Sequence, residues 1–143
     1  MSVSAIQREL EAERDQVLAE VRALAAAGGI PADHLPSEDP SGERVTVALE
    51  RGRRVYALYF EDRGFNTLIR APTQAEFLEQ VFRRATSRMA DKAHRSRMAA
   101  GLSPSEVRFE IWADLLSGVR TEWGDRLRRS KGELLGLPGS LKL

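Results

Sequence analysis

The chain has 143 residues, of which 42% are hydrophobic and 30% are charged. This length and composition are typical of one folded domain with a hydrophobic core, and they argue against a disordered polymer. The absence of cysteine excludes disulfides, thiolate catalysis and cysteine-ligated zinc. His34 and His94 are too few for a metal centre built from histidines, although a mixed site with carboxylates stays open. We expect no cofactor.

The sequence carries no sign of membrane insertion. It contains no run of roughly 18 apolar residues, and charges begin at Arg8 without a preceding apolar signal segment. We therefore expect a soluble, cytoplasmic protein without a membrane partner.

Positive and negative charges are nearly balanced, with a net charge of +1, but they are unevenly distributed. Residues 1–50 hold 4 basic and 10 acidic side chains, whereas residues 51–100 hold 11 basic and 5 acidic ones. Phosphate contacts require a net basic face, so the overall balance disfavours nucleic acid as a general partner. A local basic patch remains open.

The first predicted element is a helix over residues 1–27. Ser4 and Gln7 have the spacing of a capping box. One apolar stripe follows the helical period at Val3, Ile6, Leu10, Val17, Val21 and Leu24. Gly28-Gly29 ends the helix, and a loop with three prolines spans residues 30–43.

Residues 44–71 predict a three-stranded antiparallel β-meander. Val45, Val47 and Leu49 alternate with less apolar residues, as in a half-buried strand. Residues 55–60 are apolar or aromatic on both parities, which is typical of a central strand. The connections at residues 51–53 and 61–64 are short, so neighbouring strands must run antiparallel.

Three helices are predicted over residues 73–135, starting at a Thr73–Glu76 capping box, at Ser103-Pro104 and at Thr121. The first of them is expected to continue to about Ala100. Their apolar stripes are Phe77, Leu78, Val81, Phe82, Ala85 and Met89; then Val107, Ile111, Trp112, Leu115 and Leu116; then Trp123, Leu127 and Leu134. The order of elements indicates a single α+β domain, with helices packed on one face of a small antiparallel sheet.

Asp91 and His94 form a candidate catalytic pair, because their spacing places a carboxylate and an imidazole on one helix face. No nucleophile can be assigned to the pair, so a solvated helix face is the favoured interpretation. His34 lies in a turn-rich loop without further support for catalysis. We therefore expect a non-enzyme.

A basic stripe of Arg84, Arg88, Lys92 and Arg95 recurs at helical spacing in the first of these three helices. Such a stripe can engage an acidic partner or a phosphate backbone and can accelerate association. The alternative is neutralisation inside the protein by the acidic N-terminal helix.

The central strand offers a second candidate surface. If Val55, Ala57 and Tyr59 face the helices, then Tyr56 and Phe60 face the other way and form an aromatic patch for a partner. In the alternative arrangement, the N-terminal helix covers that second face.

Several motifs over residues 53–135 resemble, in order and spacing, those of a bacterial immunity protein family of polymorphic toxin systems, the one numbered 63. The matching elements are the strand at residues 55–60 with the turn at 61–64, Glu76-Phe77-Leu78, Met89-Ala90, Leu115-Leu116-Ser117-Gly118 and Glu122-Trp123. The resemblance implies a cytoplasmic protein that neutralises the C-terminal domain of a cognate toxin by forming a stoichiometric complex.

For contact with that toxin, the candidate residues are the basic stripe together with Tyr56 and Phe60. Two alternatives stay open: a small nucleic-acid-binding regulator that uses the basic helix over residues 83–97, and a structural module that forms a homodimer through an open sheet face.

Overall fold

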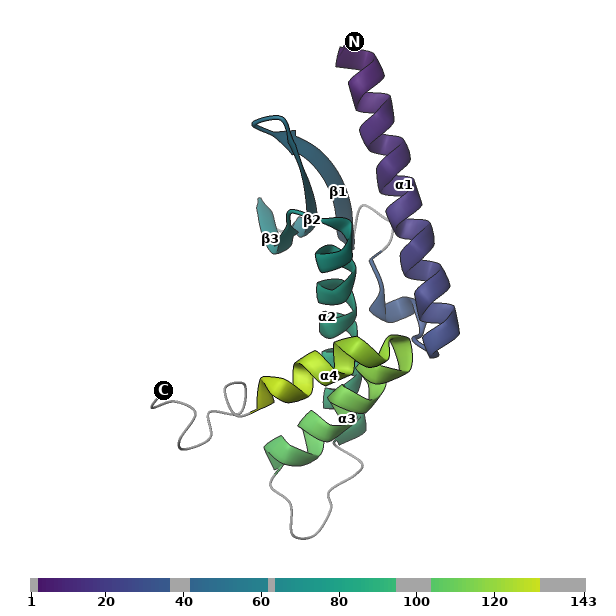
Figure 1. Ribbon diagram of the computed structural model, residues 1–143, viewed down its shortest axis with the longest axis vertical. Helices are drawn as coiled ribbons and strands as arrows, with labels where there is room; N and C mark the ends of the chain where they lie inside the picture. The colour runs from purple at the N-terminus through teal and green to yellow at the C-terminus, as the bar shows by residue number, and fades with distance from the viewer. Residues whose placement is uncertain (1–2, 37–41, 62–63, 95–103, 132–143) are drawn as a thin grey trace, which may run out of the picture. The chain divides into compact units, whose positions relative to one another are not determined.

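The computed structural model of the chain describes residues 3–36, 42–61, 64–94 and 104–131. In chain order (Figure 1) the elements are helix α1 (Val3–Gly28), the 3₁₀ helix η1 (Ala32–His34), strands β1 (Glu43–Glu50), β2 (Arg53–Glu61) and β3 (Phe65–Ala71), and helices α2 (Gln74–His94), α3 (Pro104–Val119) and α4 (Thr121–Arg129). This order confirms the predicted α+β class. The end of the predicted helix at Ala100 lies outside the described residues.

The chain forms two compact units. Unit 1 consists of Met1–Ala26 and Pro31–Val81, and unit 2 consists of Ala27–Ile30 and Phe82–Leu143. Unit 1 therefore holds the sheet, most of α1 and the first turns of α2. Unit 2 holds the end of α1, the rest of α2, and helices α3 and α4. The single domain expected over residues 1–143 remains a prediction.

The three strands form an antiparallel sheet in the order β1-β2-β3, which confirms the predicted meander. The β1–β2 hairpin turns through Arg51 and Gly52, which both have positive φ values, 53° and 77°. Two consecutive left-handed residues are typical of a type I′ turn, whose twist matches that of the flanking strands. The resulting register places Val47 opposite Tyr56.

The pairing between β2 and β3 contains one irregularity. Leu58 lies opposite Ile69, whereas the next residue, Tyr59, lies opposite Thr67. Leu68 is therefore an extra residue in β3. A bulge of this kind interrupts the ladder of backbone hydrogen bonds and increases the local twist.

One face of the sheet, the inner face, packs against α1 and the first turns of α2. The ring of Tyr56 lies 6.3 Å from that of Phe77 between centroids, and its hydroxyl donates to Glu13 of α1. The buried apolar residues of unit 1 are Val17, Leu18, Val21, Ala25, Val45, Val47, Tyr56, Leu58, Ile69, Ala71, Phe77, Leu78 and Val81. Burying one large side chain of this kind stabilises the folded state by about 1.5–3 kcal/mol, so the inner face contributes much of the stability of unit 1.

The orientation of β2 decides between the two arrangements that the sequence left open. Tyr56 and Leu58 are 7% and 1% exposed, whereas Val55 and Ala57 are only half-buried. The arrangement in which Tyr56 faces away from the helices is therefore wrong. Helix α1 does cover the Tyr56 side, as in the alternative arrangement, but α2 packs on that same side and not on the opposite one. Since α1 and α2 share that side, the opposite face of the sheet is the one left half-exposed.

The predicted helix starts have different outcomes. The Thr73 hydroxyl accepts a hydrogen bond from the Glu76 backbone N–H at 3.2 Å, which confirms this cap. Thr121 is not a cap, because α3 continues to Val119 and Arg120 is the single residue left to take the N-cap position. Ser4 lies inside α1 rather than before it. Ser103 lies outside the described residues.

In unit 2, the second half of α2 packs with α3 and α4. The rings of Phe82 and Trp123 stack with centroids 5.7 Å apart. The buried residues of this unit include Ile30, Phe82, Ala85, Thr86, Ala90, Val107, Phe109, Ala113, Leu116, Trp123 and Leu127. The predicted stripe of α3 is partly wrong: Phe109 and Ala113 are buried, whereas Ile111 and Leu115 are half-buried. The reason is that α3 contacts both α2 and α4, so residues on two of its sides are buried.

Candidate interaction surface

The basic stripe on α2 is less exposed than the sequence suggests. Arg84 and Arg88 are half-buried, and each already interacts with other groups of the protein. Lys92 is exposed, and Arg95 lies outside the described residues. The structure thus leaves Lys92 as the described member of the stripe that is most accessible to a partner.

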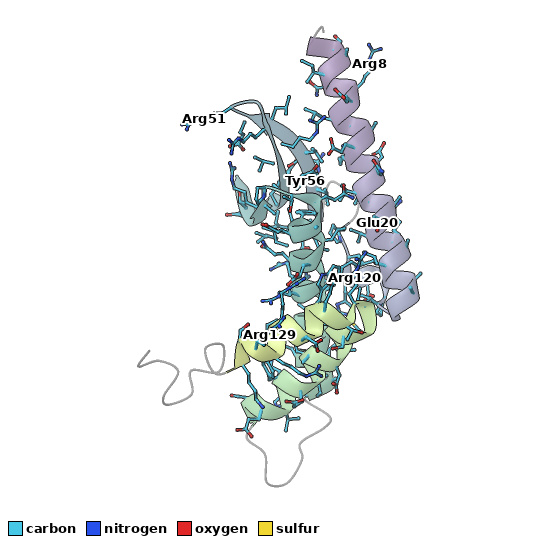
Figure 2. The ribbon with its side chains drawn as sticks, in the orientation of Figure 1. Arg8, Glu20, Arg51, Tyr56, Arg120 and Arg129 are labelled. Carbon is cyan, nitrogen blue, oxygen red and sulfur yellow. The ribbon has the colours of Figure 1, made fainter. Side chains whose placement is uncertain are left out.

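The acidic residues of α1 engage the sheet. Glu13 accepts hydrogen bonds from the Tyr56 hydroxyl and from Arg54 Nε, the latter at 2.5 Å. Glu9 adds a longer ion pair to the same guanidinium, with 3.7 Å between Arg54 Nη2 and Glu9 Oε1. We call Glu9, Glu13, Arg54 and Tyr56 the Glu13 cluster. Figure 2 shows Tyr56 between the sheet and α1, where it holds helix and strand together.

The Glu13 cluster shifts the ionisation of its members. Burial alone would raise the pKa of Glu13, but hydrogen bonds from Tyr56 and Arg54 lower the pKa overall. Burial, followed by the bond to the Glu13 carboxylate, raises the pKa of Tyr56 to about 12. The tyrosine therefore stays a neutral donor and the glutamate a charged acceptor over the whole neutral range. Tyr56 is thus buried and hydrogen-bonded within the protein, so it is not accessible to a partner.

Asp91 is engaged by α3. Its carboxylate accepts a hydrogen bond from Arg108 Nε. The same guanidinium donates to the Ser87 hydroxyl at 2.5 Å and lies 5.4 Å above the ring of Trp112. Trp112 in turn donates its indole N–H to the Arg83 carbonyl at 3.0 Å. These contacts hold α2 against α3, and no pattern in the sequence indicates this role of Arg108.

An accessible mixed surface is the side of the sheet turned away from α1 and α2, which we call the outer face. Cross-strand pairing places its residues in rows across the sheet. The rows are Glu50 and Arg53; Ala48 and Val55; Thr46, Ala57 and Arg70; and Arg44, Tyr59 and Thr67. All of these side chains are half-buried or exposed. The outer face therefore has a small apolar centre with polar and charged neighbours.

Phe60 does not belong to the outer face. It lies opposite Glu43 and Asn66 and shares the parity of Tyr56, so it is at the end of the inner face. Its side chain is half-buried. Of the two aromatic contact residues expected from the sequence, Tyr56 is buried and Phe60 keeps partial exposure.

Arginines give the outer face a positive character. Arg44 of β1 lies over the Tyr59 ring, with 6.0 Å from its guanidinium carbon to the ring centroid. Arg53 is exposed, and Arg51 projects at the tip of the hairpin (Figure 2). Arg70 donates to Glu50, which holds the pKa of that carboxyl below its ordinary value. These arginines were not predicted as contact residues from the sequence, although the Arg51-Gly52 turn fixes the register that groups them.

Among the described residues, no helix is long and apolar enough to cross a membrane. Within the same part of the chain, no three histidine or acidic side chains gather closely enough to hold a metal ion. A scan against protein-family models, a search of curated proteins and a search of solved structures each found no match to the chain.

Proposed function

We propose that this chain is an immunity protein that binds the C-terminal domain of a cognate bacterial toxin and neutralises it by forming a stoichiometric complex. The outer face of the sheet is the observation that carries the proposal. Half-exposed Val55, Ala57 and Tyr59 lie there beside arginines from all three strands. Inhibition requires no chemistry from this chain, because covering or distorting the toxin's active site is sufficient.

The composition of the outer face supports a protein partner. Binding energy at interfaces is concentrated in a few residues, with tyrosine and arginine enriched, which lie in an apolar centre surrounded by a polar rim. The outer face combines the Tyr59 ring and the small apolar side chains of Ala48 and Ala57 with an arginine rim. The resemblance to the immunity family over residues 53–135 includes the central strand of this sheet.

Neutralisation of a cognate toxin, sought among the products of the genes next to this one, tests the proposal. The C-terminal domain of that toxin would be expressed from an inducible promoter in a sensitive host, with and without this chain. We expect growth to be restored only when the chain is present, and the two purified proteins to form a 1:1 complex in light scattering. Unrelieved toxicity beside abundant soluble chain, together with no complex, would reject the immunity function.

Lys92 provides a comparison within the same assay, because it represents the basic stripe on α2. If Lys92→Glu abolished neutralisation while substitutions on the outer face did not, the toxin contact would lie on α2 instead. The immunity function would then stand with a different contact surface.

A further inference from the structure

Each strand of the sheet contributes one arginine to the outer face, and the described acidic side chain there is already engaged. The arginines are Arg44 of β1, Arg53 of β2 and Arg70 of β3. Glu50 is bonded to Arg70 and lies opposite Arg53 in the β1–β2 register. The described part of the outer face is therefore net positive around its apolar centre.

We propose that the outer face docks onto an acidic protein surface, one whose carboxylates surround an apolar patch. This inference rests on the proposed function in one respect only, namely that the partner is the toxin. Complementary charge favours such a surface, because carboxylates can pair with exposed Arg53 and are attracted by the positive charge of Arg44 and Arg70, while apolar groups cover Val55 and Ala57. Arginine also binds carboxylates through two parallel hydrogen bonds, which fixes the orientation of the partner.

The composition of the outer face argues against two other partners, a second copy of the chain and a single-stranded nucleic acid. A second copy of the chain would bring two sets of arginines together across a twofold axis, and like charges at an interface repel. Single-stranded nucleic acid requires a basic groove with several stacking rings. Tyr59 is the described aromatic ring on this face, and the guanidinium of Arg44 already lies over it. The apolar row of Ala48 and Val55 offers no donor to a phosphate.

The bulge makes the β3 edge of the sheet a poor site for strand addition by a partner. An added strand requires an uninterrupted row of backbone groups along the edge strand. Leu68 breaks that row between Thr67 and Ile69, and it is 36% exposed. A partner that meets the outer face instead is recognised through side chains, and its charge then matters.

A positive docking face also restricts where the chain binds its toxin. A cleft that binds nucleic acid is itself basic, because it must neutralise phosphates. The outer face would be repelled by such a cleft. If the toxin acts on nucleic acid, the chain docks on an acidic surface outside the phosphate-binding cleft and inhibits from there.

An acidic probe tests this surface without any toxin. The isotope-labelled full chain would be titrated at low salt with an acidic copolymer of glutamate and tyrosine, and separately with polyuridylate, while amide NMR shifts are followed. We expect the copolymer to shift residues of β1, β2 and β3 and to bind more tightly than polyuridylate. Arg53→Gln should weaken copolymer binding about threefold, whereas the matched charge removal Arg129→Gln on exposed α4 should leave it unchanged.

Every outcome of the titration decides the inference. Shifts confined to α2 or α4, equal sensitivity to Arg129→Gln, absence of copolymer binding, or tighter binding of polyuridylate would each overturn it. Concentration-dependent dimerisation that masks the outer face would overturn it in favour of a second copy. The neutralisation assay separates the two proposals: a chain that neutralises toxin but fails the titration keeps its function and loses this surface. A chain that passes the titration but fails to neutralise keeps the surface and loses the function.

Discussion

Arg108 and Arg128 of unit 2 and Arg53 of unit 1 show two different uses of arginine, although Arg54 of unit 1 also joins a helix to a strand. In unit 2, Arg108 and Arg128 lie between helices, where they pair with Asp91 and Asp114 and also bond to serine hydroxyls. In unit 1, Arg53 lies exposed on the open side of a sheet whose other side is buried. A positive side chain that joins two helices stabilises the fold, whereas one at the rim of a half-exposed face is available to a partner.

The aromatic residues show the same difference. Phe82, Phe109 and Trp123 are all buried in the core of unit 2. Unit 1 directs Tyr56 inward to Glu13 and leaves Tyr59 half-exposed on the outer face. Substitutions in unit 2 should therefore affect stability, and those on the outer face of unit 1 should affect binding.

The largest stability effect is expected for Phe82→Ala. Phe82 is fully buried against Trp123, and truncating a buried phenylalanine typically costs about 3–5 kcal/mol. Both tryptophans, Trp112 and Trp123, belong to unit 2. The urea concentration at the midpoint of unfolding, measured by tryptophan fluorescence, should fall strongly. If the amide NMR signals of β1, β2 and β3 are lost at the same urea concentration, the two units unfold together; if they are not, the stabilities of the units are separate.

A smaller loss is expected for Gly124→Ala in unit 2. A Cβ at this position would lie 1.7 Å from the Ser117 hydroxyl oxygen and 3.0 Å from the Ser117 Cα, so α3 and α4 must separate. Overpacking of this kind costs about 1–3 kcal/mol. The double variant Gly124→Ala with Ser117→Gly should unfold at higher urea concentration than Gly124→Ala alone. Equal midpoints for the two variants would show that the helix separation is not limited by this contact.

In unit 1, Tyr56→Phe should destabilise the fold by about 1–2 kcal/mol, because it removes the hydroxyl that donates to the Glu13 carboxylate. Toxin neutralisation should be unaffected, since Tyr56 faces α1. Thermal unfolding measures the first effect, and the growth assay measures the second. A loss of neutralisation at unchanged stability would place Tyr56 at the interface after all.

The Glu13 cluster also predicts a pH dependence. The folded-state pKa of Glu13 is below its ordinary value of 4.5, so its stabilisation is complete above that pH and is lost as the pH falls through the folded value. For Tyr56 the folded-state pKa is raised from 10.0 to about 12, so stability falls as the pH rises across this interval. At acid pH the unfolding free energy of the wild type should fall more than that of Glu13→Gln. At alkaline pH the unfolding free energy of the wild type should fall more than that of Tyr56→Phe.

The smallest stability effect is expected for Glu50→Gln on the outer face. The Glu50–Arg70 pair is solvent-exposed, and exposed pairs contribute little to stability, so the unfolding midpoint should not change measurably. Binding of an acidic partner should become faster, because the face loses its described negative charge. Stopped-flow association at low salt measures this change, and slower association would contradict the charge argument.

The order of the elements could be predicted from the sequence because its signals were local. Alternation around Val45, the Arg51-Gly52 turn and the Thr73 cap each act within a few residues. The inner side of β2 could not be predicted, since Val55 and Tyr56 are both apolar enough to be buried. Contacts with Glu13 and Phe77, which are distant from Tyr56 in the sequence, determine which side of β2 is buried.

The candidate site was harder to predict than the fold. The sequence drew attention to Arg84 and Arg88 because they are periodic on one helix, yet both are half-buried. Arg44 and Arg70 lie 26 residues apart in the sequence and come together only through pairing of both with β2. Such a surface depends on the strand register. The bulge in β3, which sets the register of Thr67 against Tyr59, is not indicated by any pattern in the sequence.

The most direct test of the central claim is the affinity of the cognate toxin domain for the Ala57→Glu variant. Ala57 lies at the centre of the outer face between Thr46 and Arg70, so a carboxylate there is compatible with the sheet but opposes an acidic partner. We predict that the variant has the same unfolding midpoint as the wild type. Its dissociation constant for the toxin domain should be about thirtyfold higher, which is typical of a hot-spot residue. Unchanged affinity in a correctly folded variant would contradict the outer face as the docking surface.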